Sequence, residues 1–287
     1  MSRMTRHSAQ TERLRMAYRR SGDPDGLPMI LVHGSYATGR WWEPFMRILP
    51  TEILAVAPDL RGCGDTERAT DGYDVPDQAA DLNAFVDFLG WTDFDLVAHS
   101  SSGAVAVEYA LARPHIVRTL TLVDSVPAEG VFTPLETYLL LDRMRSDRDL
   151  LAQALASLMP TFAGEDAQTE DADRAFFQTL VDDAAAMAPP AFTAVAEGLA
   201  RWNRFADVDR LTLPTQLIWG DLDIVVDRDA TTRTLIAIPG AHNLEVLHHV
   251  GHSPMIEAPV ALAERIIEFI TDDLDDYGAV RQMGYDG

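Results

Sequence analysis

The sequence contains no lysine and only one cysteine, Cys63. Its 23 basic residues are therefore all arginine, they stand against 45 acidic residues, and the formal net charge at pH 7 is −22. A chain this acidic repels the phosphates of nucleic acids and anionic membrane surfaces, so we expect neither as a partner. A single cysteine excludes an intrachain disulfide and fits the reducing cytoplasm, where we expect the protein to reside.

Long apolar runs and metal-ligand spacings are also missing. No apolar stretch reaches the roughly 18 residues that a membrane-spanning helix requires. Residues 1–11 are polar and lack the apolar core of a signal peptide, so we expect neither a membrane anchor nor secretion. The eight histidines form no ligand pairs at useful spacing, and His248 and His249 are adjacent, so we expect no metal site.

What the sequence does have is an alternation of short apolar segments with amphipathic ones. This pattern predicts an α/β fold, in which helices flank a mostly parallel, twisted sheet. Several apolar segments are continuous, which is typical of strands buried on both faces. The expected strands are 13–18, 28–32, 53–57, 94–99, 117–123, 215–219 and 243–247, and the clearest helices are 76–89, 104–112 and 259–271.

The alternation stops after Val123 and resumes near residue 210. Between these points, residues 127–209 carry apolar residues at helical spacing and few strand signals, which predicts an all-helical cap inserted into the core. We therefore expect a core made of residues 12–126 and 210–271. The remaining residues, 1–11 and 272–287, are expected to be flexible termini.

The most informative segment is 94–103, in which an apolar strand runs into Ser100 and then into a helix. Such a segment predicts a nucleophile elbow, a tight turn that lifts a serine hydroxyl above the sheet. The turn requires small residues two positions before and after the nucleophile, and Ser100 has Ala98 and Ser102 there. Ser102 stays open as an alternative nucleophile, whereas Ser101 has a bulky residue in the crowded position.

A serine hydroxyl needs a base to take its proton and a carboxylate to orient that base. His252 is the expected base, because it follows a glycine in a loop between a strand and a helix. His248 and His249 compete with it but lie nearer the end of the strand. The order Ser, Asp, His along the chain is the one found where the elbow follows a central strand.

The expected acid is Asp223, which stands three residues beyond Gly220, the end of an apolar strand. Asp221 follows the same strand directly and is expected to point away from the histidine. Asp124 ends the strand 117–123 and can reach the same histidine from the neighbouring loop. It therefore remains an alternative acid.

The negative charge that develops on a carbonyl oxygen during acyl transfer needs hydrogen-bond donors, which usually supply the largest catalytic contribution. Ser35 follows an apolar strand that ends in a His33–Gly34 turn, so its backbone N–H is one expected donor. The N–H of Ser101, at the start of the helix, is the expected second donor of this oxyanion hole. His33 is expected to hold the loop rather than to act as a base.

Four segments support this interpretation and occur in a consistent order: 31–36, 59–65, 94–103 and 250–254. Together they resemble the α/β-hydrolase superfamily, in particular its cap-bearing serine esterase and meta-cleavage-product hydrolase branch. The resemblance implies the roles given above, and it assigns 59–65 to a structural loop. Related haloalkane dehalogenases and epoxide hydrolases carry an aspartate at the elbow, so a serine there favours acyl chemistry.

These residues predict a serine hydrolase that cleaves carboxylic esters or lactones through an acyl-enzyme, without a cofactor. We expect the helical insertion to roof the site. Tyr36, Trp41, Met144 and Trp202 are expected to line a pocket for a small apolar or aromatic substrate. The exposed face of the insertion is also where a homodimer would form.

Two other functions remain open. Hydrolysis of a carbon–carbon bond in a meta-cleavage-type diketo acid uses the same triad, and the carboxylates of such a substrate would require an arginine in the pocket. Arg40, Arg143 and Arg201 are the available candidates. A ligand-binding protein of this fold would keep the same residues but show little turnover, so multiple turnover on activated esters separates it from an enzyme.

Overall fold

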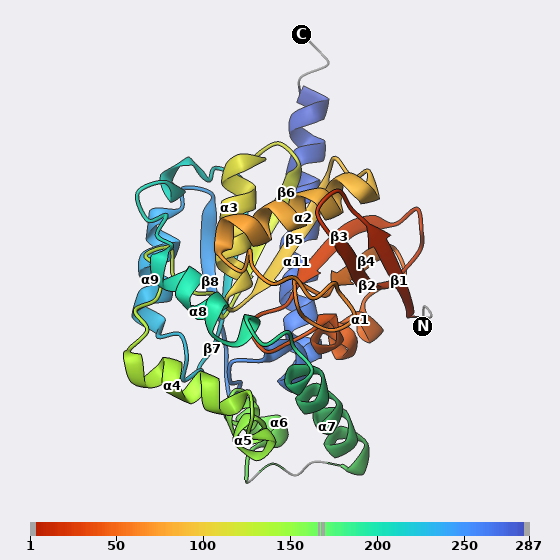
Figure 1. The fold of residues 1–287 in the computed structure, drawn as a ribbon. Coiled ribbons are helices and arrows are strands. Elements are labelled where there is room, and N and C mark those ends of the chain that lie inside the picture. Colours follow the sequence, from red (N-terminus) through yellow and green to blue (C-terminus); the bar gives the residue numbers. More distant parts are fainter. Residues whose placement is uncertain (1–3, 166, 168–169, 284–287) are drawn as a thin grey trace.

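A computed structural model of the chain describes residues 4–165, 167 and 170–283. Eight strands form one sheet in the order β1-β2-β4-β3-β5-β6-β7-β8 (Figure 1). They are β1 (Thr5–Gln10), β2 (Arg15–Ser21), β3 (Leu27–Val32), β4 (Ile53–Pro58), β5 (Phe94–His99), β6 (Val117–Val123), β7 (Thr215–Gly220) and β8 (Ala241–Leu247). Strand β2 runs antiparallel to both β1 and β4, and the pairs from β4 to β8 are all parallel.

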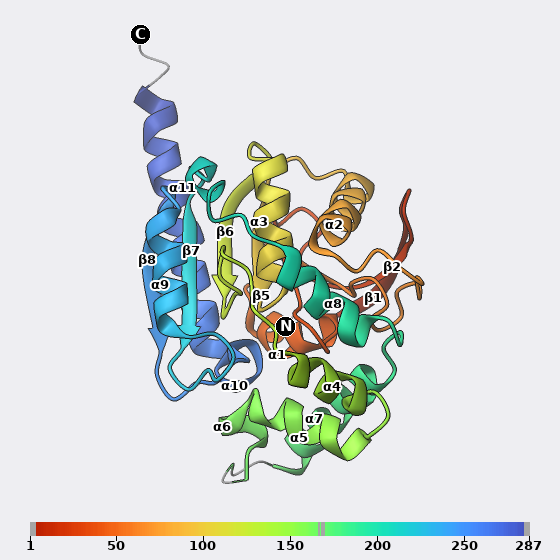
Figure 2. The ribbon, with the colours of Figure 1, turned by 60° about the vertical axis from the view of Figure 1, so that its left-hand side comes forward.

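The central strands are apolar throughout because both faces of the sheet are covered. In β3, Met29 and Leu31 belong to one buried cluster, whereas Ile30 and Val32 belong to the other, as the two-residue period of a strand requires. Helices α1 (Glu43–Ile48) and α11 (Pro259–Met283) pack on one face, and α2 (Val75–Leu89), α3 (Ser102–Ala112) and α9 (Arg228–Ala237) on the other (Figures 1 and 2). The short helices η1 (Gly39–Trp42), η2 (Val208–Arg210) and α10 (Pro254–Glu257) lie in the connections. The α/β-hydrolase fold class is thereby confirmed.

The chain between β6 and β7 folds into helices. These are α4 (Leu135–Met144), α5 (Arg148–Ser157), α6 (Pro160–Ala163), α7 (Asp171–Ala185) and α8 (Ala191–Arg201). They lie at the end of the sheet where the parallel strands have their carboxyl ends, with α4 to α7 farthest from the sheet (Figure 2). Arg40 Nε lies 2.7 Å from Asp183 Oδ2, and Tyr36 donates its hydroxyl to the carbonyl of Phe192 at 2.8 Å. These bonds fasten the insertion to the core.

Both predicted flexible termini contain regular structure. Thr5–Gln10 forms the edge strand β1, and every one of its residues pairs with β2. At the other end, α11 continues to Met283, so residues 272–283 are helical rather than irregular. Residues 1–3 and 284–287 of the predicted termini lie outside the described residues. Within the described part of the chain, no helix has both the length and the apolar content needed to cross a bilayer.

Candidate active site

Ser100 occupies a sharp turn between β5 and α3. Its φ of 56° lies in the left-handed region, where a residue other than glycine is strained and usually held by its surroundings. Its backbone N–H donates to the carbonyl of Val123 at 3.0 Å, and its carbonyl accepts from Gly103 N at 3.0 Å. A Cβ on Gly34 would lie 2.8 Å from the Cβ of Ser100. Only glycine therefore lets the loop after β3 approach the elbow this closely.

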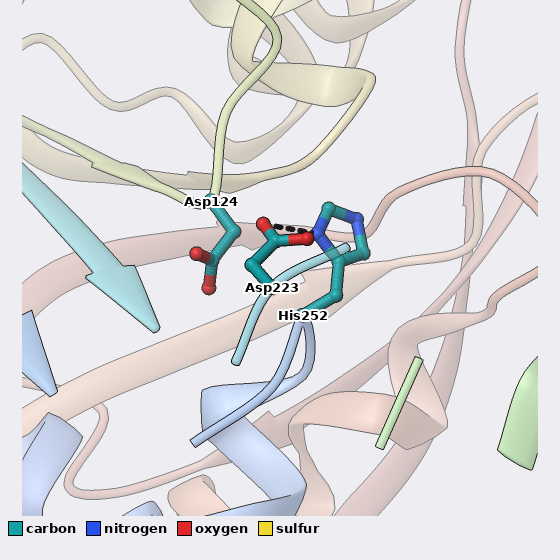
Figure 3. Close-up of side chains that lie close together, drawn as sticks. All are labelled: Asp124, Asp223 and His252. Carbon is teal, nitrogen blue, oxygen red and sulfur yellow. Dashed lines mark hydrogen bonds and ion pairs between the residues drawn. The ribbon is translucent and has the colours of Figure 1, made fainter. Parts of the chain in front are cut away.

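The structure brings the three predicted triad residues together. Ser100 Oγ lies 2.8 Å from His252 Nε2, and His252 Nδ1 lies 2.8 Å from Asp223 Oδ2 (Figure 3). The side chains of His252 and Asp223 are 3% and 0% exposed, respectively. A neutral imidazole with its proton on Nδ1 satisfies both contacts, because Nδ1–H donates to the carboxylate while Nε2 accepts the serine proton.

Three of the alternatives to the triad residues, Asp221, His248 and His249, bond one another rather than the triad. Asp221 accepts hydrogen bonds from His248 Nδ1 at 3.0 Å and from the backbone N–H of His249 at 2.7 Å. The His248 side chain is 78% exposed. Asp223, in contrast, has its second oxygen Oδ1 fixed by the N–H groups of the two residues that follow Ile224. The loop after β7 thus holds Asp223 inward and Asp221 outward.

Asp124, the other predicted rival, is fully buried beside Asp223. Its Oδ1 accepts the backbone N–H of Gly220 at 2.8 Å, and no hydrogen bond joins it to His252. Asp124, Asp223 and His252 each offer a ligand atom within 4.8 Å of the others, which is chemically a potential metal site. The 2.8 Å separation of His252 Nδ1 and Asp223 Oδ2 is, however, that of a direct hydrogen bond.

The two predicted oxyanion donors face each other across the elbow. Ser35 and Ser101 both border the cavity above Ser100, and their hydroxyl oxygens lie 3.0 Å apart. Neither backbone N–H donates to any atom of the residues that the structure describes. Both N–H groups are thus available to a substrate oxygen.

His33 and Tyr36 shape the loop that carries Ser35. His33 donates from Nδ1 to the Gly34 carbonyl at 2.8 Å and accepts the Leu60 N–H at Nε2 at 2.9 Å. Burial lowers the pKa of His33, so its imidazole stays neutral and can accept at Nε2. Tyr36 has a φ of 60°, and burial raises the pKa of its phenol. Its hydroxyl contacts the insertion rather than pointing at Ser100.

Ser102 and His99 brace the elbow. Ser102 Oγ lies 2.9 Å from the carbonyl of Val32 and 2.8 Å from that of His99, and it accepts the His99 N–H at 3.1 Å. His99 Nε2 donates to the backbone carbonyl of His252 at 2.6 Å. Burial, followed by the nearby imidazole of His252, lowers the pKa of His99 well below its usual value. The Ser102 hydroxyl is thus engaged with the backbone.

A cavity of about 660 Å³ opens above Ser100 and His252. Of the predicted pocket residues, Tyr36, Trp41 and Met144 line it. The prediction for Trp202 is wrong: this residue does not border the cavity but packs in the core, where its indole N–H donates to Glu108 Oε2 at 3.0 Å. An aromatic residue in a helical segment can pack inward or toward a pocket, and its spacing alone does not distinguish the two.

The mouth of this cavity is apolar, and its residues are not among those predicted for the pocket. Phe132 and Leu140, from the insertion, are 88% and 43% exposed, and Ile224 and Val225, from the loop after Asp223, are 72% and 53% exposed. All four border the cavity. The sequence signal for the second pair is its position, since two large apolar residues directly follow the triad acid on a loop.

Arginines play little part in the cavity wall. None of Arg40, Arg143 and Arg201 borders it. Arg233 does border it, but its Nε is paired with Glu129 Oε1 at 2.6 Å. The described lining therefore offers no arginine free of a carboxylate partner.

Comparisons with known proteins identify the family of the chain and several relatives. A model of the alpha/beta hydrolase family matches residues 29–265. The monoacylglycerol lipase abhd6-B of Xenopus laevis is 28% identical over 275 residues, covering 90% of this chain and 79% of that protein. A soluble epoxide hydrolase of Corynebacterium sp. (strain C12) is 32% identical over 124 residues, 43% of each chain. A solved membrane phospholipase A, described as a bacterial virulence factor, is similar with a TM-score of 0.79 and 25% identity, covering 94% of this chain and 86% of that one.

Proposed function

Because the chain belongs to the alpha/beta hydrolase family, and because its elbow presents a serine to a histidine, we propose that it hydrolyses carboxylic esters through an acyl-enzyme. The observation that carries this proposal is the pair of 2.8 Å hydrogen bonds from Ser100 to His252 and from His252 to Asp223. A serine nucleophile forms an ester with an acyl group, which water can then cleave.

In the proposed reaction, Ser100 Oγ attacks the ester carbonyl while His252 Nε2 takes its proton. His252 then returns that proton to the leaving alcohol, and the acyl group remains on Ser100. A water molecule, deprotonated by the same nitrogen, releases the acid and restores the serine. Asp223 holds the imidazole with its proton on Nδ1 and stabilises the imidazolium that forms in both steps.

The oxyanion is proposed to bind the backbone N–H groups of Ser35 and Ser101. Both are free of partners among the described residues, and both residues border the cavity beside Ser100. Removing one such donor in an enzyme of this kind typically lowers kcat by about 10²- to 10³-fold. Among the amino acids only proline lacks a backbone N–H, and at either position it would also fix φ and disturb the loop or the elbow.

The proposed substrate is an ester with an apolar acyl or alcohol group. The cavity wall is largely apolar, and its mouth exposes Phe132 and Ile224. The relatives named as a monoacylglycerol lipase and a phospholipase A support an ester of an acyl chain. The −22 net charge disfavours a polyanionic substrate.

The test is hydrolysis of p-nitrophenyl acetate, butyrate and octanoate by the wild type, Ser100→Ala and Ser146→Ala. Ser146 is the matched control, since it is an exposed serine that bonds only its own helix end, at the Arg143 carbonyl. We expect repeated turnover by the wild type and by Ser146→Ala, and a loss of about 10³-fold or more in Ser100→Ala.

Either of two results would contradict the proposal. No turnover by the folded wild type would favour the ligand-binding alternative or carbon–carbon hydrolysis. Turnover that persists in Ser100→Ala would remove Ser100 from the reaction. The relative rates for acetate, butyrate and octanoate measure the length of acyl chain that the cavity accepts.

A further inference from the structure

Asp124 is a buried carboxyl group that the proposed reaction does not use. It directly follows β6, and its N–H donates to the carbonyl of Ile218 in β7 at 2.9 Å. Its φ of 42° lies in the left-handed region, and this backbone conformation turns the side chain toward the loop after β7. Figure 3 shows the Asp223 carboxyl group between Asp124 and the His252 ring.

The hydrogen-bond donors are unequally divided between the two carboxyl groups. Asp223 accepts from His252 Nδ1 and from the backbone N–H groups of Val225 and Val226. Asp124 accepts only from Gly220 N, at Oδ1, and no described donor reaches its buried Oδ2. Because donors stabilise a carboxylate and burial without donors destabilises it, the negative charge belongs on Asp223 and a proton on Asp124.

The closeness of the two carboxyl groups favours the same arrangement. Oxygens of Asp124 and Asp223 lie within 4.8 Å of each other, and two ionised carboxylates this close would repel each other, whereas a proton on one of them removes that repulsion. Burial, followed by the charge of Asp223, raises the pKa of Asp124 well above its usual value, and Glu257 on α10 acts in the same direction. The groups that face Asp124 therefore favour its neutral form.

We propose that Asp124 is a positioning residue for the triad, a neutral acid whose Oδ2–H donates to the Asp223 carboxylate and holds it toward His252. This inference rests on the proposed function, because it gives the triad acid a partner of its own. It also explains why two aspartates follow neighbouring strands. Asp223 orients the base His252, and Asp124 orients Asp223.

The variants that test it are Asp124→Asn and Asp124→Gly. Asparagine can accept the Gly220 N–H and donate its own N–H to Asp223, and it tolerates a positive φ. Glycine accepts the same φ without strain but makes neither bond. We expect kcat for p-nitrophenyl butyrate to fall about 10- to 100-fold in Asp124→Gly, as for loss of a hydrogen bond to a charged group. KM should stay close to the wild-type value, and Asp124→Asn should recover at least most of that loss.

A double-mutant comparison separates positioning from general support of the fold. In an Asp223→Asn background, Asp124→Gly should lower kcat by no more than about twofold further, because its effect passes through Asp223. Addition of EDTA or Zn²⁺ to the wild type should leave kcat unchanged. The inference would be overturned if the double variant showed a full further loss of kcat, or if EDTA abolished activity. It would also be overturned if Asp124→Asn were as impaired as a folded Asp124→Gly, or if Asp124→Gly were fully active.

A spectroscopic readout keeps the test independent of turnover. The proton on His252 Nδ1, bonded to a buried carboxylate, should give a strongly downfield ¹H NMR resonance that is absent in His252→Ala. Its position should change in Asp124→Gly and return toward the wild-type value in Asp124→Asn. If the wild type hydrolyses no ester, the proposed function fails while this resonance still reports on Asp124. An identical resonance in all Asp124 variants overturns the positioning role.

Discussion

Replacing Asp223 with asparagine should disable the reaction while leaving the fold intact. The carboxyl group is buried, and the substitution preserves its volume. Asparagine Oδ1 can still accept the N–H groups of Val225 and Val226, which would turn its NH₂ group toward His252 Nδ1. Two donors would then meet, so the imidazole would move its proton to Nε2, and Ser100 would lose the acceptor for its own proton.

The size of the effect follows from this tautomer change. A triad that loses the correct tautomer in this way loses about 10⁴-fold in kcat, equivalent to roughly 5 kcal/mol of transition-state stabilisation. The assay is hydrolysis of p-nitrophenyl butyrate, with kcat and KM measured separately and the melting temperature measured for both proteins. We expect the loss in kcat and little change in KM.

Asp221→Asn is the matched control, because Asp221 lies two residues away and its carboxylate bonds His248 and the backbone of His249 and Val250 rather than His252. It should retain wild-type turnover. A loss of about 10⁴-fold in kcat is expected for Asp223→Asn, so a variant that keeps more than about a tenth of the wild-type kcat would contradict this role of Asp223. Equal losses of activity in Asp221→Asn and Asp223→Asn would contradict it as well.

Three further results are expected. The pKa of Asp124 is raised in the folded protein, so above the unfolded pKa of about 4 only the folded chain keeps the proton, and wild-type stability falls as the pH rises. The melting temperature of Asp124→Asn should therefore exceed that of the wild type by a margin that grows from pH 4 to pH 8. A margin that does not change with pH would contradict this. Ser102→Ala loses the bonds to the elbow backbone. It should lower the free energy of unfolding in urea by about 1–3 kcal/mol but still form the acyl-enzyme. Loss of the acyl-enzyme at unchanged stability would make Ser102 the nucleophile. Met144→Trp should lower the rate for octanoate relative to acetate, because Met144 lines the cavity. Trp202→Phe should leave that ratio of rates unchanged, because Trp202 does not border the cavity. Equal changes of the ratio in both variants would contradict this assignment of the cavity lining.

The core of the sheet could be predicted because burial on both faces leaves a direct mark on the sequence. The apolar runs at 28–32, 94–99 and 117–123 coincide with β3, β5 and β6 within one residue. Strand β1 carries no such mark: it is a polar edge strand, mostly exposed, whose only strong constraint is its pairing with β2. Residues 11–14 join the two strands in a hairpin, so β1 is held by backbone pairing with the segment that follows it, and this pairing leaves no apolar mark in its composition.

The site shows the same division between local and long-range information. The elbow around Ser100 is a local motif, and spacing alone identifies it. The choice between Asp124 and Asp223 is not local, because both follow parallel strands that end at the same edge of the sheet. The three-dimensional course of the loop after Gly220 brings Asp223 to His252 and leaves Asp124 beneath it. The side chain of Trp202 was misplaced for a related reason, since only tertiary packing decides which face of a helix end is buried.

The most direct test of the central claim is to trap the acyl-enzyme. The protein is mixed with excess p-nitrophenyl acetate, quenched in acid within the first turnover, digested and analysed by mass spectrometry. We expect one acetyl group on the peptide that contains Ser100, present in the wild type and absent in Ser100→Ala. Steady hydrolysis without that adduct, or an adduct on a different residue, would contradict it.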